Sequence, residues 1–197
     1  MTAPISILVA YPKEFACYSK FLRKVEFYTS KTDHVELISF EDANGFIQKY
    51  AEEKGVPHKT QPSESGALSL ATHAIVFEDR NCFEELRKHL KENNKPTRTI
   101  KLNLTIVVNK DRDEPYDIYI GRGTIWGNPY QIGQDGDRDE VIRKFEYDFK
   151  RGFLKASENF EKNISTLKGK VIACHCKPAA CHGDVIAQYI NSLDDGE

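Results

Sequence analysis

The residues best suited to chemistry in this sequence lie close together in one short stretch. Three cysteines and two histidines fall between positions 174 and 182, in the run CHCKPAACHGD. Thiolate and imidazole groups are the ligands that zinc prefers in proteins, and four of them close a tetrahedral site. The spacing C-x-C-x4-C-H therefore predicts a zinc site whose ligands are Cys174, Cys176, Cys181 and His182.

Two other interpretations of this stretch stay open. Cys181 is expected at a helix start, where a thiol can have a lowered pKa and become a nucleophile. A cysteine phosphatase would place an arginine at the position of His182, so a phosphate clamp of that kind is missing. A buried strand with small apolar thiols would explain Cys174, but not the polar residues at the helix start.

The loop GRGTIWGNPYQIG, residues 121–133, is a second candidate region. Glycine lets the backbone approach a ligand, and its exposed N–H groups can bind an anion. Arg122 could hold a phosphate with two hydrogen bonds, Trp126 could stack on a base, and Asn128 could donate to a base and accept from it. The alternative is a structural loop in which Trp126 caps the core. The residues predicted to bind substrate are Gly121, Arg122, Gly123, Trp126, Gly127 and Asn128.

Strands and helices alternate through the first half of the chain. The apolar runs at 5–11, 34–40 and 73–79 are of strand length, and each is followed by a segment with helical spacing. Strands that alternate with helices of this length predict a parallel sheet covered by helices on its faces. The polar turn NNKPT marks our predicted boundary, between a domain at 1–96 and a domain at 97–197.

The second half predicts a smaller set of elements that position the candidate residues. Residues 100–110 and 116–123 are predicted as strands, and residues 137–170 as helix with a break at Gly152. Phe153 falls on the predicted core face of that helix. The cysteine run follows a strand at 169–176 and enters a helix. We therefore expect an α/β fold: a Rossmann-like parallel-sheet half, followed by a smaller α/β half with a Cys/His strand–loop–helix corner.

The order of elements over residues 5–94, with the phrase IQKYAEEKGVPHKTQPS, resembles the Rossmann-like nucleotide-binding family of the DNA-uptake protein and the "lonely guy" enzymes. That family has a glycine-rich turn after its second strand, where a helix N-terminus holds phosphate. The equivalent stretch here, ISFEDANGF, has one glycine, Gly45, and two acids, Glu41 and Asp42. The resemblance therefore implies a degenerate nucleotide-binding-type domain with a scaffold or partner-binding role.

The motifs of the second half also resemble a known family. A Gly-Arg, a Trp-Gly-Asn-Pro and a C-x-C-x-P-x2-C-H-G-D run, spread over residues 116–190, are similar to an uncharacterised domain of unknown function found in phage and bacterial genomes. The resemblance implies a phage-type accessory protein whose motif residues form one site. Those residues are Gly121, Arg122, Trp126, Gly127, Asn128, Pro129, Cys174, Cys176, Pro178, Cys181, His182, Gly183 and Asp184.

These features lead to one main functional hypothesis: an enzyme that acts on nucleic acid or nucleotides and cuts the DNA sugar-phosphate backbone, also at damaged or abasic positions. An open zinc position would give a bound water with a pKa near 7. If all four ligands bind, the zinc is structural, and a second divalent metal is left open. The predicted catalytic residues are Arg122, Asp184 and His175.

Two alternatives come from other classes of protein. One is a nucleotide N-glycosidase, and the other is a non-enzymatic adaptor that binds a host protein, for example a DNA-repair enzyme. The composition is that of an ordinary globular protein, with 40% hydrophobic and 29% charged residues. Apolar runs are too short to cross a bilayer, so we expect no membrane association. Five cysteines suggest no disulfide framework, which favours the cytoplasm, that of the host cell if the protein is phage-encoded.

Overall fold

The structure is a computed structural model that describes residues 5–30, 32 and 34–196 of the 197-residue chain. It divides into two compact units: unit 1 is Met1–Leu102 with Asp194–Glu197, and unit 2 is Asn103–Leu193. Each contains a parallel sheet with helices, so the predicted α/β fold class is confirmed. No helix of the described residues is long and apolar enough to span a membrane.

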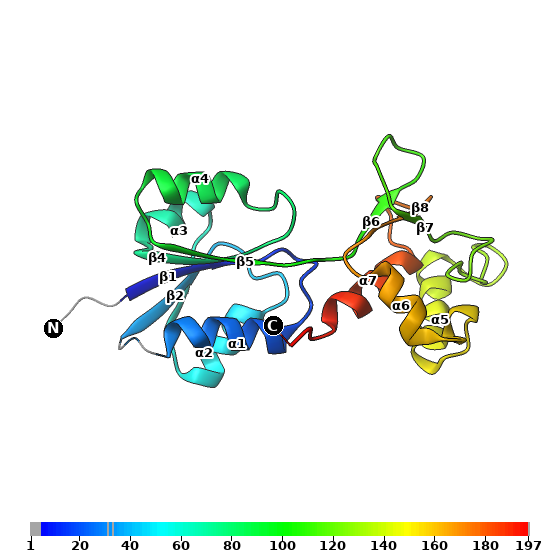
Figure 1. The fold of residues 1–197 in the computed structure, drawn as a ribbon, viewed down its shortest axis with the longest axis horizontal. Coiled ribbons are helices and arrows are strands. Elements are labelled where there is room, and N and C mark those ends of the chain that lie inside the picture. Colours follow the sequence, from blue (N-terminus) through cyan, green and yellow to red (C-terminus); the bar gives the residue numbers. More distant parts are fainter. Residues whose placement is uncertain (1–4, 31, 33, 197) are drawn as a thin grey trace. The chain divides into compact units, whose positions relative to one another are not determined.

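Unit 1 is built on a five-stranded parallel sheet in the order β3-β2-β1-β4-β5. Helices α1 and α2 cover one face of this sheet, and α3 and α4 cover the other (Figure 1). The central strands are almost fully apolar because both of their faces are buried. The elements are β1 (Ile5–Ala10), α1 (Tyr18–Thr29), β2 (Val35–Ser39), α2 (Phe46–Lys54), β3 (His58–Thr60), α3 (Glu64–Leu70), β4 (His73–Glu78), α4 (Glu84–Glu92) and β5 (Thr97–Lys101).

The division between the units comes after β5, not before it as predicted. β5 pairs in parallel with β4, with Val76 opposite Thr99, and so belongs to the first sheet. The run that we predicted as one strand, 100–110, is interrupted after Lys101 and resumes at Ile106 in the sheet of unit 2. A continuous β-branched sequence does not show at which residue the chain leaves one sheet for another.

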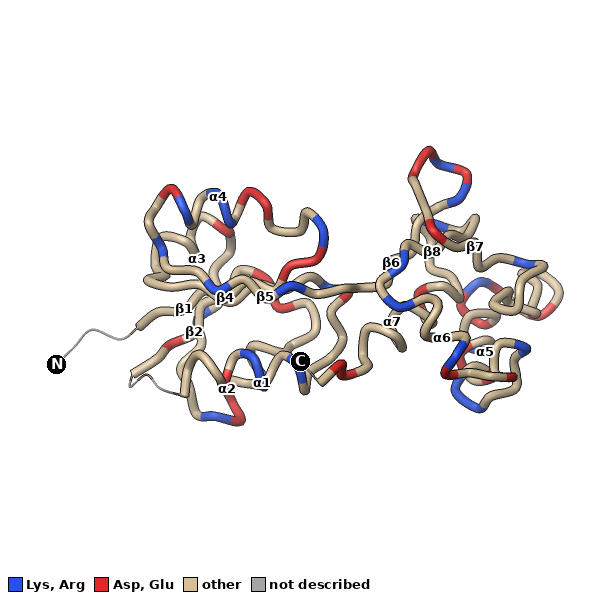
Figure 2. The backbone as a smooth tube through the Cα atoms, viewed as in Figure 1, with Lys and Arg blue, Asp and Glu red and all other residues tan. Residues whose placement is uncertain are grey.

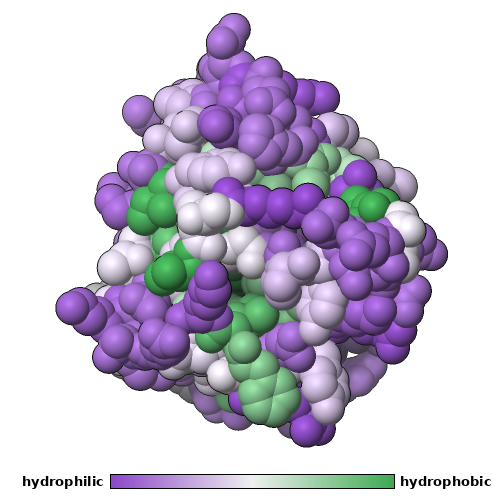
Figure 3. Space-filling view, turned by 90° about the vertical axis from the view of Figure 1, so that its right-hand side faces the viewer, coloured by the Kyte–Doolittle hydropathy of each residue, from purple (hydrophilic) through white to green (hydrophobic). Residues whose placement is uncertain are grey.

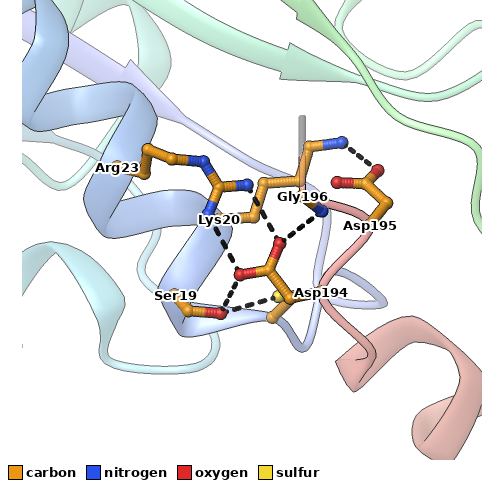
Figure 4. A network of polar contacts seen from close by, with 7 residues as sticks. Ser19, Lys20, Arg23, Asp194, Asp195 and Gly196 are labelled. Atoms are coloured by element: carbon orange, nitrogen blue, oxygen red, sulfur yellow. Dashed lines mark hydrogen bonds and ion pairs between the residues drawn. The ribbon is translucent and has the colours of Figure 1, made fainter.

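Residues 194–196, which follow unit 2 in the sequence, are bound to α1 of unit 1 (Figure 4). The Asp194 carboxylate accepts two hydrogen bonds from the Arg23 guanidinium, at 2.9 and 3.0 Å, and one from the Ser19 hydroxyl at 2.6 Å. These bonds, with Arg23 first, hold the pKa of Asp194 well below its usual range. The buried Lys20 ammonium pairs with Asp195. The acidic end of the described chain is therefore part of unit 1, which the predicted domain 97–197 did not anticipate.

Unit 2 contains a three-stranded parallel sheet in the order β6-β8-β7. The predicted break at Gly152 is confirmed, since this residue ends α5 in the left-handed region with φ 76°. The chain turns there, and the Phe153 side chain is 68% exposed. The prediction that Phe153 lies on the core face of the helix was therefore wrong. The elements are β6 (Ile106–Asn109), β7 (Ile118–Tyr119), α5 (Arg138–Arg151), the 3-10 turn η1 (Lys155–Ser157), α6 (Phe160–Leu167), β8 (Val171–Cys174) and α7 (His182–Ser192).

Candidate functional site

Three cysteines of unit 2 lie together between β8 and α7. Cys174 ends β8, and Cys181 is the N-cap of α7. A turn closed by the Ala179 N–H, which donates to the Cys176 carbonyl oxygen at 3.0 Å, folds the loop back. The Cys174 and Cys176 Sγ atoms are 3.6 Å apart, and the three sulfur atoms all lie within 4.8 Å of one another. Sulfur ligands that are about 2.3 Å from one tetrahedral metal ion are about 3.8 Å apart, so this group could hold a metal ion.

His182, the predicted fourth ligand, is buried beside this group. Its Nε2 lies 2.9 Å from the carbonyl oxygen of Ile120, and its ring also hydrogen-bonds with the Cys174 thiol. A metal-binding histidine commonly donates one ring N–H to a backbone carbonyl, which orients the other nitrogen toward the metal. Among the described residues, the group of ligand atoms that lie close to one another does not include an atom of His182. Binding of a metal ion by His182 therefore stays a prediction.

We refer to Cys174, Cys176 and Cys181 together as the thiol group. Within it, hydrogen bonds favour negative charge on Cys174. Hydrogen bonds from the Cys181 thiol and the His182 ring hold the pKa of Cys174 well below its usual range. The pKa of Cys181 is raised by that same hydrogen bond to Cys174 and by burial. Burial, followed by the neighbouring Cys174, raises the pKa of Cys176. A bound cation would favour the deprotonated form of all three thiols at once.

Asp184 positions the Cys181 loop instead of lining a cavity. Its carboxylate accepts a hydrogen bond from the Cys181 N–H at 2.8 Å, and pairs with the Lys177 ammonium. The Asp184 N–H donates to the Cys181 carbonyl oxygen at 3.0 Å. The Cys181 side chain also accepts from the Asp184 N–H, and together with the bond to the Asp184 carboxylate this forms a capping box that fixes the start of α7. Asp184 therefore has a structural role at the start of α7, and its predicted role in moving a proton stays a prediction.

The glycines of the 121–133 loop allow close contacts within the protein. A Cβ atom on Gly121 would lie 2.1 Å from the Tyr119 hydroxyl, and one on Gly127 would lie 2.8 Å from the Gly121 carbonyl oxygen. Gly123 has φ +91° and turns the chain. Gly123 and Gly127 were both predicted as ligand-binding positions; Gly127 shapes the loop because backbone approaches backbone there, and Gly123 does so through its positive φ.

Two other predicted substrate contacts are engaged in the fold. Trp126 is 5% exposed and packs in the hydrophobic core of unit 2, so stacking of its ring on a base is corrected to a core role. The Asn128 amide donates to the Val141 carbonyl oxygen at 3.1 Å and accepts from the Tyr130 N–H at 2.9 Å. Both ends of the amide already bind backbone, and reading of a base by Asn128 stays a prediction.

A cavity of about 370 Å³ joins the two candidate regions. Arg122 and Arg138 both line it, and none of its described lining residues is acidic. Hydrophobic side chains gather near the centre of the surface that Figure 3 presents, bordered by hydrophilic ones. The predicted site residues that line the cavity are Gly121, Arg122, Asn128, Cys174, His175, Cys176, Cys181 and His182. Their roles in binding or catalysis stay predictions.

Two residues that line this cavity, Arg138 and Tyr119, were not predicted from the sequence, nor was Asp111, which contacts the lining residue His175. Arg138, in the first turn of α5, donates to the Ala180 carbonyl oxygen at 3.2 Å and hydrogen-bonds with the Cys176 sulfur. Tyr119 and Asp111 both hydrogen-bond with the His175 ring. Because parallel strands end at the same edge of a sheet, residues at the ends of β6, β7 and β8 meet there. Correct boundaries for these three strands would have predicted that Asp111, Tyr119 and His175 lie close together.

In unit 1, the position at which the resembled family holds phosphate is filled by the protein itself. The Asp42 carboxylate accepts hydrogen bonds from the Ile47 N–H at 3.1 Å and the Gln48 N–H at 2.9 Å, at the start of α2. The Tyr11 hydroxyl also donates to Asp42. Burial, with this hydrogen bond, raises the pKa of Tyr11. A phosphate at this helix N-terminus would have to displace a carboxylate.

Comparison with known proteins separates the same two regions. Residues 5–108 match the minimal SLOG domain, and residues 106–192 match a domain of unknown function, DUF4326. The chain is 42% identical over 88 residues to an uncharacterized 12.4 kDa protein in the nrdA-td intergenic region of Enterobacteria phage T4. That alignment covers 44% of this chain and 78% of the phage protein. The chain matches no solved structure.

These matches support the coarser part of the resemblances drawn from the sequence. The chain is similar to an uncharacterised phage protein, and the SLOG match suggests a nucleotide-related function. The minimal SLOG match extends over more than half of the sequence. The chain therefore belongs to the minimal SLOG domain family, and over 88 residues it is related to the phage T4 protein.

Proposed function

We propose that unit 2 is a hydrolase that binds one nucleotide unit of DNA and cuts the adjoining phosphodiester bond. The observation that carries the proposal is the cavity of about 370 Å³, in which two arginines, a histidine and a tyrosine converge beside the thiol group. Its volume falls in the range of pockets that bind small molecules. It suits a single nucleotide and not a whole duplex.

The lining of the cavity supports binding of a nucleotide in two parts. Arg122 and Arg138 supply guanidinium groups, which bind phosphate oxygens with paired hydrogen bonds. Ile132, Val141 and Ile142 supply apolar surface for a sugar or base. No carboxylate among the described lining residues opposes an anion there.

Entry of a single nucleotide into this cavity favours damaged or single-stranded DNA. A nucleotide inside a duplex must leave the base stack before it can enter such a pocket, and this costs least at a mismatched, damaged or unpaired position. Along α5 of unit 2, Lys and Arg alternate with Asp and Glu (Figure 2), so this helix offers no long basic track for a duplex. Abasic and single-stranded DNA are therefore the expected substrates.

The thiol group fits a metal ion that supports the cavity wall. Cys174, Cys176 and Cys181, with His182, would hold zinc as four protein ligands, and such a closed site stabilises the loop between β8 and α7. Proton transfer then belongs to His175, which lines the cavity and is held by the Asp111 carboxylate at 2.7 Å.

The proposal predicts that the full chain nicks DNA, and that Arg122→Ala lowers kcat/KM by about 100-fold, the loss typical when one charge-stabilising donor is removed. The substrates are labelled single strands and duplexes that are undamaged, contain uracil or contain one abasic site. Arg143→Ala is the matched control, since Arg143 lies on α5 with its side chain 76% exposed. We expect it to cut like the wild type.

The products distinguish the alternatives. Uncut strands in all substrates would contradict the proposal. Free base released without a strand break would instead support a nucleotide N-glycosidase, the activity that the SLOG match favours as a second candidate. Equal cleavage by the wild type and Arg122→Ala would support nuclease activity but would show that Arg122 does not contribute to it.

A further inference from the structure

Tyr119 is held in a hydrogen-bonded series that ends in the cavity. Its hydroxyl oxygen lies 3.0 Å from His175 Nε2, and His175 Nδ1 lies 2.7 Å from an Asp111 carboxylate oxygen. The three side chains come from the ends of three neighbouring parallel strands, β7, β8 and β6. A hydroxyl, a histidine and a carboxylate in this order form the arrangement that activates a nucleophile in acyl and phosphoryl transfer.

The Tyr119 hydroxyl also has a defined place against the glycine loop. A side chain on Gly121 would put its Cβ 2.1 Å from this oxygen, so a residue without a side chain makes room for the phenol. Tyr119, Gly121 and Arg122 all line the cavity. The Lys110 ammonium lies 4.6 Å from the centre of the Tyr119 ring, a contact that helps to fix the position of the ring.

Stability of the fold does not account for this series. The side chains of His175 and Asp111 are 50% and 61% exposed, and exposed pairs of this kind contribute little to the free energy of unfolding. The Tyr119–His175 hydrogen bond is thus better explained by a chemical role of the Tyr119 hydroxyl in the cavity than by stabilisation of the fold.

We propose that Tyr119 is the nucleophile of the reaction, an inference that rests on the proposed function. The phenol oxygen bonds to the phosphorus of the bound phosphodiester, and its proton moves to His175 Nε2. The bond from phosphorus to the departing sugar oxygen breaks, and that oxygen takes the proton from His175. Water then cleaves the tyrosyl phosphodiester, which restores the phenol and leaves a phosphomonoester, so no electrons are gained or lost.

The nucleophile can be tested without knowledge of the natural substrate. An adenosine sulfonyl fluoride, 5′-fluorosulfonylbenzoyl adenosine, reacts with activated phenols: the tyrosine oxygen bonds to sulfur and fluoride leaves. Peptide mass spectrometry of the full chain should find Tyr119 labelled at least about 10-fold faster than Tyr116, an exposed tyrosine of the same unit. Asp111→Asn, which weakens the support of His175, should reduce this ratio. Labelling of Tyr119 no faster than that of Tyr116 would overturn the inference.

A second measurement uses cleavage itself. Tyr119→Phe should lower cleavage of abasic DNA by at least about 100-fold, the loss expected when the attacking group is removed, with an unchanged melting temperature. Tyr116→Phe is the control and should keep its activity. In the wild type, rapid quenching should trap a Tyr119 peptide that carries a nucleotide phosphate.

The two measurements separate failure of the inference from failure of the proposed function. Wild-type cleavage that Tyr119→Phe retains would show that another group attacks, while the nuclease would stand. Absence of cleavage, with fast labelling of Tyr119 that depends on Asp111, would keep the nucleophile and contradict DNA as its substrate.

Discussion

Replacement of Cys181 with serine should abolish metal binding at the proposed site of unit 2 and destabilise that unit. A structural zinc site contributes on the order of 10 kcal/mol of folding free energy, so the loss of one ligand should lower the free energy of unfolding of unit 2 by about 3 kcal/mol or more. Unit 1 has its own sheet and core and should be unaffected. Calorimetry will resolve the two transitions, and elemental analysis will give the metal content.

Cys82→Ser is the matched control for this substitution. Cys82 is an exposed thiol of unit 1, outside the thiol group. The Cys82→Ser variant should keep about one metal ion per chain and both unfolding transitions. A wild-type protein without metal, or a Cys181→Ser variant that retains it, would contradict a metal site between β8 and α7.

Replacement of Gly121 with alanine should abolish the proposed cleavage activity by moving Tyr119. The new Cβ would lie 2.1 Å from the Tyr119 hydroxyl, so the ring must swing away from His175. We expect cleavage of abasic DNA to fall by about 100-fold, with a small change in melting temperature because Tyr119 is only half-buried. Steady-state kinetics on the same abasic substrate will measure the loss.

A double variant shows whether the two positions act together. Gly121→Ala with Tyr119→Phe should be no less active than Tyr119→Phe alone, since residues that act as one unit are not additive. Gly133→Ala is the loop control: its backbone has φ +88°, but its methyl group enters open space. Equal losses in Gly121→Ala and Gly133→Ala would assign the effect to distortion of the loop.

The sequence was most informative where the chemistry is local. Continuous apolar runs predicted the central strands of unit 1, because a strand covered on both faces has few polar residues. The cysteines of the thiol group lie within a few positions of one another, so the strand–loop–helix corner alone brings them together. The acids Glu41 and Asp42 indicated that the phosphate-binding position of the resembled family is altered here. The Asp42 carboxylate does accept hydrogen bonds from the first N–H groups of α2.

The remaining parts depend on contacts between distant positions. Asp111 and Tyr119 meet His175 across 64 and 56 positions, through strand pairings that no local pattern specifies. Trp126 shows the second difficulty, since a tryptophan in a glycine-rich loop can face either the core or a ligand. Its burial here follows from packing with α5 and β8, which the loop sequence does not reveal.

We propose that the nucleotide site lies in unit 2, since Asp42 occupies the helix start in unit 1. The most direct measurement is an amide NMR titration of the full ¹⁵N-labelled chain with a thymidine dinucleotide. We predict shifts confined to residues 119–132, 138–142 and 174–182, reduced in Arg122→Ala. Shifts centred instead on residues 42–48 would place the site in unit 1 and contradict the claim.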